Sequence, residues 1–472
     1  MATHPVLADD AAQFLASRIN YERAATVPYG KRDFRLDRMR QLLARLGNPH
    51  DGLRIAHIAG TKGKGSAAAM LAAVLTAAGY RTGLYSSPHL DRVEERLAID
   101  GVPCPADELA ELVAQVRPVV TAMDAESPGP EGESTRPTYF EIVTALALLR
   151  FAQQGTQAAV LEVGMGGRLD STNVCRPLVS VITSISLDHT QQLGSTLAAI
   201  AAEKAGIIKP GVPVVSGVQA PEPRDVIAKI AAERGCLLVE FGRDFDSTYH
   251  PPQRLDRAAQ PALVDFHDRS GNFGLACQGL ELSLLGSHQA ANAAVALATI
   301  AQLRRSGFDI AESAIRQGLA SVRWPARVEV LSRRPTMVLD AAHNVASAQA
   351  LVQVLGESFA ARRRVLVFAT TRDKDLRGML EVLLPHFDDV VFTRYWSNPR
   401  SVPPEALDAA AAELGSTRRQ MCPDPATAWQ AASRLVGPDD LLCIAGSFFI
   451  AAEMRAAIAQ TTSGNHNAAT TR

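Results

Sequence analysis

The stretch RIAHIAGTKGKGSAAAMLAAVL, residues 54–75, contains an apolar run, a glycine-rich loop and an alanine-rich helical pattern in direct succession. This order predicts a buried strand, a tight turn and a helix. Because the helix starts at the turn, its first N–H groups face the loop, where they favour a bound anion. The stretch therefore predicts an α/β fold with a phosphate-binding loop.

The spacing of this loop differs from that of the common phosphate-binding loop, G-x-x-x-x-G-K-[ST]. With Gly60 as the first glycine of this motif, the second glycine of the motif is Gly65. Ser66 follows Gly65 directly, and the lysine, Lys64, comes before Gly65 instead of after it. Lys64 can still neutralise phosphate charge, and Ser66 can still offer a hydroxyl to Mg²⁺. The loop alone leaves a glycine-rich turn without a ligand as the alternative.

The composition is that of a globular protein with more than one domain. A chain of 472 residues is too long for one hydrophobic core. Its 48 Lys and Arg balance 49 Asp and Glu, so we expect no nucleic-acid or membrane-surface partner. The six cysteines lack metal-ligand spacing, and we find no secretory signal and no apolar run of about 18 residues. We expect a cytoplasmic protein without a membrane span.

Short apolar runs alternate with helical patterns along the chain, which is typical of βαβ units in a mainly parallel, doubly wound sheet. The expected strands cover 53–59, 81–86, 158–163, 178–185, 212–217 and 236–241, and in a second series 327–332, 336–341, 364–370, 389–395 and 441–446.

Two interruptions divide the chain. The segment 242–284 is rich in Pro, Asp and Gly and predicts a small antiparallel excursion, and Trp324 with Pro325 separates the two strand series. The Pro/Gly segment 124–137 is expected to be unstructured. We expect an N-terminal domain of the P-loop type over 1–324, a C-terminal Rossmann-like domain over 325–460, and a disordered tail over 461–472.

Polar residues stand where several predicted strands end. Glu162 ends one apolar run, Asp188 and His189 follow the next, and Lys204 lies on the helical pattern after them. Ligands of open α/β sheets bind outside the carboxyl ends of the strands, so these side chains should converge near Lys64. Such a set suits a metal and nucleotide site, whereas each residue alone is more often a solvated or paired charge.

The ordered motifs resemble those of the folylpolyglutamate synthase and dihydrofolate synthase family, within the wider Mur ligase family. The matching strings are HIAGTKGKGS, YSSPHL with ERLAIDG, TYFEIVTALAL, LEVGMGGRLDSTN, SLDHTQQLG, AEKAGIIK, WPARVEVL, LDAAHN and DKD. They cover most of residues 35–450 in the family's order, and the ordered set is far more specific than any single string.

The resemblance implies an ATP-dependent ligase that joins L-glutamate to the carboxylate of a folate and, in its bifunctional form, to dihydropteroate. In such a ligase the carboxylate attacks the γ-phosphate to give an acyl phosphate, which the amino group of L-glutamate then displaces. Closure of the two domains would complete the site. The resemblance also implies ATP and two Mg²⁺ as cofactors, small-molecule substrates, and a monomer.

The family's motifs carry roles onto individual positions. ATP contacts fall on the loop residues Gly60, Thr61, Lys62, Gly63, Lys64, Gly65 and Ser66, on Asn292 at the base, on Asp340 at the ribose and on Arg327 at the terminal phosphate. Metal ligands fall on Ser66, Glu162, His189 and Lys204, the lysine as a carbamate, and the catalytic set is Lys64, Lys204, His189 and Arg327. The substrate side is Ser87, Pro88, His89, Arg168, Asp170, Ser171, His343 and Lys374.

Two departures from the family pattern stand out. Ala341 and Val345 replace the usual Gly and Pro of the LDAAHN motif, and Lys62 stands where many bacterial members have Asn. Two alternatives to the folate ligase are open. One is a Mur-type ligase that adds an amino acid to a cell-wall nucleotide precursor, against which SSPHL and GTKGKGS stand. The other is an ATP-gated binding module without ligase activity.

Overall fold

The computed structural model describes residues 5–22, 36–126, 136–271, 273–415 and 418–469, with side chains described between 9 and 460. Two compact units make up the chain. The first unit contains residues 1–248, 264–281 and 289–322, and the second contains 249–263, 282–288 and 323–472. The predicted α/β class is confirmed in both units, while most of the segment expected to be unstructured, 127–135, lies outside the described residues.

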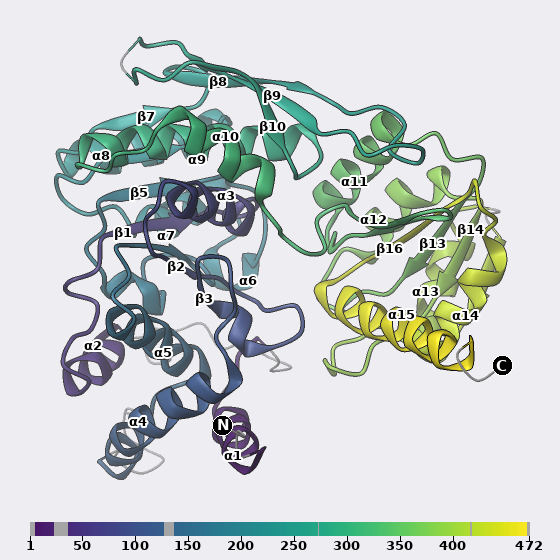
Figure 1. Cartoon of the computed structure of the whole chain (residues 1–472), viewed down its shortest axis with the longest axis horizontal. Helices are drawn as coiled ribbons and strands as arrows, with labels where there is room; N and C mark the ends of the chain where they lie inside the picture. The colour runs from purple at the N-terminus through teal and green to yellow at the C-terminus, as the bar shows by residue number, and fades with distance from the viewer. Residues whose placement is uncertain (1–4, 23–35, 127–135, 272, 416–417, 470–472) are drawn as a thin grey trace. The chain divides into compact units, whose positions relative to one another are not determined.

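A seven-stranded sheet in the order β3-β2-β4-β1-β5-β6-β7 forms the centre of the first unit (Figure 1). Among the described residues of this sheet, only β3 runs antiparallel to its neighbour. The central strand β1 is buried along its whole length, which explains why its residues are apolar apart from His57. The strands are β1 Ile55–Ala59, β2 Thr82–Tyr85, β3 Leu97–Ile99, β4 Ala158–Glu162, β5 Val179–Ile182, β6 Val214–Ser216 and β7 Leu238–Glu240.

Helices pack on both faces of this sheet (Figure 1). The start of α5 is fixed by a capping box, in which Thr138 and Glu141 exchange hydrogen bonds with each other's backbone. Glu141 also forms a buried ion pair with Arg38 of α2 at 2.8 Å, which joins the two helices. The helices are α1 Pro5–Ala16, α2 Leu36–Arg45, α3 Lys64–Ala77, α4 Ala106–Ala125, α5 Tyr139–Gln153, α6 Thr190–Leu193, α7 Leu197–Ala205, α8 Pro221–Glu233, α9 Ser287–Arg305 and α10 Glu312–Ser321.

The segment predicted as a small excursion forms a separate three-stranded sheet in the order β10-β9-β8. Its strands are β8 Phe245–His250, β9 Ala262–Asp268 and β10 Cys277–Leu282. Three phenylalanines, Phe245, Phe266 and Phe273, pack against one another with ring centroids 6.0–6.2 Å apart. This aromatic cluster gives the small sheet a core of its own.

The second unit has a six-stranded sheet in the order β11-β12-β16-β13-β14-β15. Its strands pair in parallel except β11, which is antiparallel to β12, as a Rossmann-like sheet with one reversed edge requires. The elements are β11 Glu329–Arg333, β12 Thr336–Leu339, α11 Val345–Ser358, β13 Arg364–Phe368, α12 Leu376–Leu383, β14 Asp389–Phe392, α13 Pro404–Ala412, β15 Arg418–Met421, α14 Pro425–Leu435, β16 Leu441–Ala445 and α15 Phe448–Ala469.

Helix α15 reaches into the polar C-terminal segment and ends at Ala469. Extending a helix that is already formed adds one hydrogen bond for each residue fixed, whereas starting a helix is costly. The polar tail therefore continues a helix that it could not have started.

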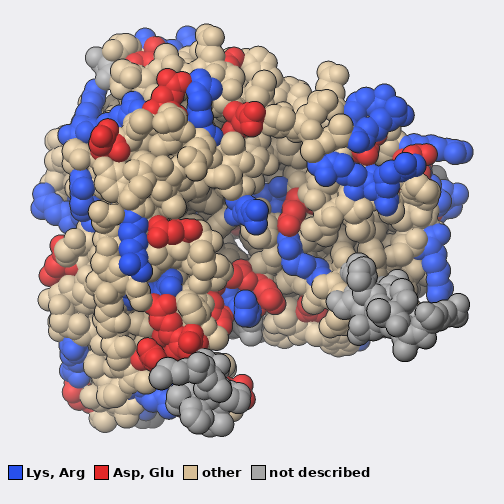
Figure 2. All heavy atoms as spheres, in the orientation of Figure 1, with Lys and Arg blue, Asp and Glu red and all other residues tan. Residues whose placement is uncertain are grey.

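None of the described helices is long and apolar enough to cross a lipid bilayer. Figure 2 shows acidic and basic side chains interspersed over one face of the first unit. This mixture agrees with the net charge of −1. Because the charges balance, we expect anions to bind only at local sites.

Candidate active site

The glycine loop has the predicted strand, turn and helix geometry. Strand β1 ends at Ala59, and α3 begins at Lys64 with Gly63 as its N-cap. Gly63 has φ +82°, and its carbonyl accepts the N–H of Ala67 at 2.9 Å. The N–H groups of the first turn have no partner within the helix, so they can bind an anion in the loop.

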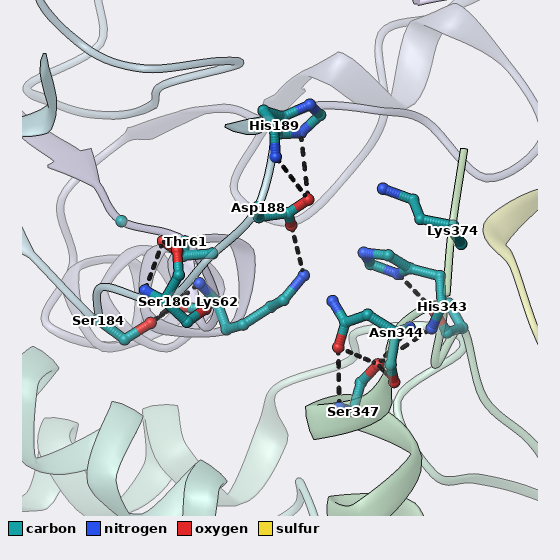
Figure 3. A network of polar contacts seen from close by, with 12 residues as sticks. Thr61, Lys62, Ser184, Ser186, Asp188, His189, His343, Asn344, Ser347 and Lys374 are labelled. Carbon is teal, nitrogen blue, oxygen red and sulfur yellow. Dashed lines mark hydrogen bonds and ion pairs between the residues drawn. The ribbon is translucent and has the colours of Figure 1, made fainter. Parts of the chain in front are cut away.

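The residues that follow β5 hydrogen-bond to the glycine loop through backbone and hydroxyl groups. The Thr61 N–H donates to the Ser184 carbonyl at 2.7 Å, and the Lys62 N–H donates to Ser184 Oγ at 2.9 Å. Thr183 Oγ1 donates to the Lys62 carbonyl at 2.7 Å. Ser186 N–H donates to Thr61 Oγ1 at 3.1 Å (Figure 3). Sequence reasoning missed these anchors, although the run TSIS directly after an apolar strand carries their signal.

Lys62 makes an ion pair with Asp188, with 2.8 Å between Nζ and Oδ2 (Figure 3). The other oxygen of Asp188 accepts the backbone N–H of His189 at 3.0 Å. His189 has φ +51° and forms the N-cap of the short helix α6. The structure thus brings Asp188 and His189 to the loop, as their position after a strand predicted, and gives the extra charge of Lys62 a partner.

Lys204 lies beneath the loop. Its Nζ, carried by α7, donates to the carbonyl of Gly60 at 2.8 Å, and the side chain is buried. Burial, together with the nearby charges of Lys64 and Lys62, lowers the pKa of Lys204 to about 7, while Asp188 opposes the shift. The side chains of Lys62, Lys64 and Lys204 place positive charge around one loop, which favours a bound anion.

Glu162 ends β4 and pairs in register with Ile58 of β1, which places it beside the start of the loop. Its buried carboxylate accepts the Ser87 N–H at 3.2 Å, and Pro88 follows Ser87 through a cis peptide bond. Ser66 is buried in the first turn of α3.

Mg²⁺ is commonly held by one or two carboxylates together with phosphate oxygens, so Glu162 and Ser66 suit one Mg²⁺ bound with ATP. Among the described residues, no three His, Cys, Asp or Glu side chains gather closely enough to hold a metal ion by themselves. The expected second Mg²⁺ relies on His189 and Lys204, and the ammonium form of Lys204 would repel it. That site fits only a carbamylated Lys204.

Asn292 lies against the loop. It sits on α9, where its Nδ2 donates to Gln289 Oε1 at 3.0 Å. A Cβ added to Gly63 would stand 2.1 Å from Asn292 Oδ1, so only glycine leaves room for this contact. The predicted base-contacting residue is thereby placed beside the predicted phosphate loop.

Asp170 organises the loop after β4. Its buried carboxylate accepts the N–H groups of Gly164, Met165 and Thr172 at 3.0–3.1 Å, and the Thr172 hydroxyl at 2.5 Å. Burial raises the pKa of Asp170, and these hydrogen bonds oppose the rise. The carboxylate predicted to face the substrate is therefore occupied within its own loop.

A buried hydrogen-bond chain continues from this loop into the sheet. Because the Thr172 hydroxyl donates to Asp170, its oxygen accepts from His57 Nε2 at 2.7 Å. The other ring nitrogen of His57 lies 3.7 Å from Cys175 Sγ and accepts its S–H. Burial lowers the pKa of His57 to about 3, so the ring is neutral. The loop is thus tied to β1 through a histidine that sequence reasoning did not single out.

The other residues predicted on the substrate side of the first unit are either hydrogen-bonded within the unit or buried. Arg168 donates to Glu203 Oε1 at 2.8 and 3.0 Å, although its side chain is 48% exposed. Ser171 is buried at the start of the turn 171–174. His89 Nδ1 accepts the Nε–H of Arg96 at 2.8 Å.

In the second unit, the buried Asp340 follows directly after β12. Its two oxygens accept the N–H groups of Val328 and Ala342, each at 2.7 Å. Burial raises the pKa of Asp340, while the charge of Arg327 and both hydrogen bonds oppose the shift. The acid predicted to contact ribose therefore also supports the chain on either side of it.

Arg327 lies in a strained turn. Its neighbours Ala326 and Val328 have φ +55° and +45°, conformations that cost on the order of 1–3 kcal/mol each for residues with a side chain. The guanidinium lies over the ring of Phe448, with Cζ 4.6 Å from the ring centroid. Neither Phe448 nor the strain was anticipated from the sequence.

His343 and Lys374 lie on loops of the same unit (Figure 3). His343 Nδ1 donates to the Ala341 carbonyl at 2.9 Å, and its backbone N–H donates to Ser347 Oγ at 3.0 Å. Lys374 Nζ lies 3.4 Å from the carboxylate of Asp373. The proximity of His343 to the end of β12 agrees with its position beside Asp340 in the motif.

The fold and this site define a two-unit α/β enzyme with a glycine loop suited to a bound nucleotide. Residues 58–300 match the family model of the Mur ligase middle domain, and residues 326–448 match that of the Mur ligase glutamate ligase domain. The chain belongs to the folylpolyglutamate synthase and dihydrofolate synthase group of the Mur ligase family. It is therefore an ATP-dependent, amide-forming ligase.

Relatives match along most of the chain. The dihydrofolate synthase/folylpolyglutamate synthase of Bacillus subtilis is 34% identical over 422 residues, 89% of this chain and 94% of its own. The folylpolyglutamate synthase of Mycobacterium tuberculosis, solved with ADP, has TM-score 0.84 and 32% identity and covers 96% of this chain and 98% of its own. Escherichia coli FolC, solved with DHPP and ADP, has TM-score 0.80 and 31% identity at the same coverage.

Proposed function

We propose that this enzyme joins L-glutamate to the carboxylate of a folate at the expense of ATP, and that it also acts on dihydropteroate. The observation that carries the proposal is the phosphate loop, in which Lys204 donates to the Gly60 carbonyl beside Lys64 and Lys62. The names of relatives that match over almost the whole chain support the choice of folate and glutamate.

The reaction has two displacement steps. A carboxylate oxygen of the acceptor attacks the γ-phosphorus of ATP, the bond to the β-phosphate oxygen breaks, and ADP leaves. The amino nitrogen of L-glutamate then attacks the carbonyl carbon of the acyl phosphate, phosphate leaves, and the nitrogen loses a proton. Lys64 and the N–H groups at the start of α3 stabilise the charge on the transferring phosphoryl group. Phosphorylation supplies the leaving group that a carboxylate lacks.

The metal ions are also part of the proposal. Ser66 and Glu162 would hold one Mg²⁺, and His189 with a carbamylated Lys204 would hold the second. Bound Mg²⁺ neutralises phosphate charge and orients the γ-phosphate. Because the pKa of Lys204 is about 7, a substantial fraction of its amine is neutral near pH 7 and can attack CO₂.

Several finer roles remain proposals that rest on the family resemblance. Asn292 contacts the base, Asp340 the ribose and Arg327 the terminal phosphate. The substrate side comprises Ser87, Pro88, His89, Arg168, Asp170, Ser171, His343 and Lys374. We further propose a cytoplasmic monomer that binds no nucleic acid and no membrane, with an ATP-binding domain over 1–324 and a glutamate-ligase domain over 325–460.

The test is a ligase assay on the purified chain with ATP, Mg²⁺ and L-glutamate, and with either dihydropteroate or a reduced folate as acceptor. The expected product is the acceptor with one added glutamyl group, identified by mass, with ADP that forms over many turnovers only when acceptor and glutamate are both present. ATP hydrolysis without a glutamylated product would contradict the proposal and favour a binding module. A product formed only on a cell-wall nucleotide precursor would favour the Mur-type alternative.

A further inference from the structure

The backbone on either side of Arg327 is unusual. Ala326 has φ +55° and Val328 has φ +45°. Residues with a Cβ rarely adopt this left-handed conformation, and a β-branched residue such as valine does so least of all. Such conformations persist where surrounding contacts hold them, and they concentrate at functional sites. The contacts that hold this turn therefore bear on how Arg327 is presented.

Two carboxylates hold the turn by its backbone. Glu329 Oε2 accepts the N–H of Ala326 at 2.9 Å, and Asp340 Oδ2 accepts the N–H of Val328 at 2.7 Å. The carbonyl of Ala326 accepts the N–H of Ala341 at 3.0 Å. Each left-handed residue is thus fixed by a hydrogen bond from its own N–H to a carboxylate, which is a strong type of hydrogen bond.

Helix α15 supplies a second support. Arg455 forms an ion pair with Glu329, and Phe448, the first residue of α15, lies against the Arg327 guanidinium. The centroid of the same ring is 5.9 Å from that of His343. An aromatic face attracts a guanidinium and restricts its rotation. Phe448 therefore contacts two residues with proposed roles in the reaction, while Glu329 supports the backbone of one of them.

We propose that Phe448 and Glu329 are positioning residues that hold the Arg327 guanidinium in a fixed orientation for the terminal phosphate of ATP. The proposal rests on the proposed role of Arg327 in the ligase reaction. A long flexible arginine loses side-chain entropy when it binds a phosphate, and an arginine already held in place has less to lose. Displacements of about 1 Å at a catalytic group can cost up to about a hundredfold in rate.

A double-mutant cycle tests this coupling. We expect Phe448→Leu to lower kcat about tenfold when Arg327 is present, and less than about twofold in the Arg327→Ala background. The matched control is Phe449→Leu, the same change one residue along, where the ring packs on Tyr395 with centroids 5.3 Å apart. Equal losses in both backgrounds, or no loss when Arg327 is present, would overturn the proposal. Thermal unfolding of each variant separates these effects from a loss of fold.

Glu329 is tested by conservative rescue. Glu329→Ala removes the acceptor of the Ala326 N–H, whereas Glu329→Gln retains an oxygen in its place. We expect the alanine variant to lower kcat about tenfold with little change in KM for L-glutamate, and the glutamine variant to recover most of this loss. Losses of the same size in both variants would show that the hydrogen bond to the turn is not what matters.

A spectroscopic arm works without ligase activity. The Arg327 Nε–H resonance, identified by its disappearance in Arg327→Lys, reports the ring current of Phe448. We expect this resonance to shift in Phe448→Leu and to stay in place in Phe449→Leu. An unchanged resonance in Phe448→Leu overturns the positioning role. If the resonance shifts in Phe448→Leu but the wild-type protein makes no glutamylated product, only the proposed function is contradicted.

Discussion

Lys62 and Asp188 form an ion pair with 2.8 Å between Nζ and Oδ2, beside a phosphate loop that already has Lys64 and Lys204 near it. The Lys62 side chain is 29% exposed and that of Asp188 13%. The pairing explains how this chain accommodates a lysine where many family members have asparagine, because Asp188 balances the added charge. The loop itself is held through the backbone of Lys62, which any residue supplies.

We therefore expect Lys62→Asn to retain most activity, with kcat/KM for ATP within about threefold of wild type and a stability loss of at most about 1 kcal/mol. Lys64→Asn is the matched comparison. It should cost about a hundredfold or more, because Lys64 stabilises charge on the transferring phosphoryl group. Steady-state kinetics of both variants measures the difference. Equal losses would mean that Lys62 contacts ATP instead of only pairing with Asp188.

Gly63 offers a sharp test of the loop geometry. With φ +82° and Asn292 Oδ1 2.1 Å from any added Cβ, Gly63→Ala should lose ATP affinity about tenfold or more. Gly79 has φ +87° with nothing within 4 Å of an added Cβ, so Gly79→Ala carries the same backbone strain without the clash. ATP binding measured by calorimetry should be close to wild type in Gly79→Ala. A similar loss in both variants would assign the effect to backbone strain alone.

The alternation of strands and helices was predictable because most strands are buried runs whose apolar pattern is local. Two strands were missed for a physical reason. Strand β3, Leu97–Ile99, has three residues, and β15, Arg418–Met421, is a polar edge strand that is mostly exposed. Strand β3 is apolar but too short to show an alternating pattern, and edge strands such as β15 are often charged and carry little apolar signal.

The site was predictable as a set of positions but not as a set of contacts. Lys62 and Ser184 hydrogen-bond across 122 residues of chain, and no local pattern specifies such a partner. Asp170 is a second example, since its motif suggests a place on the substrate side but does not specify that its carboxylate accepts hydrogen bonds from its own loop. Hydrogen-bond partners depend on tertiary proximity, which motif spacing does not contain.

Lys204 should make activity depend on pH and on CO₂. A carbamate forms only from the neutral amine, and the pKa of about 7 means that the neutral fraction falls as pH drops below 7. We expect activity to fall between pH 7 and 6, and to fall further when bicarbonate is removed from the buffer. Lys204→Ala should lose at least about a hundredfold in kcat, with partial recovery on adding acetate. Full activity in this variant would refute the carbamate role.

His57 should contribute to acid instability of the first unit. Its pKa is about 3 in the folded protein and about 6.5 when unfolded, so between these values the unfolded chain binds more protons. Stability should therefore fall as pH drops below 6.5, by roughly 1.4 kcal/mol for each pH unit from this group. His57→Gln keeps a donor for Thr172 but cannot be protonated, so its unfolding midpoint in urea should change less between pH 7 and pH 5 than that of the wild type. His386→Gln, at an exposed position, serves as the control and should keep the wild-type pH dependence. An unaltered pH dependence in His57→Gln would mean that other buried groups govern unfolding in acid.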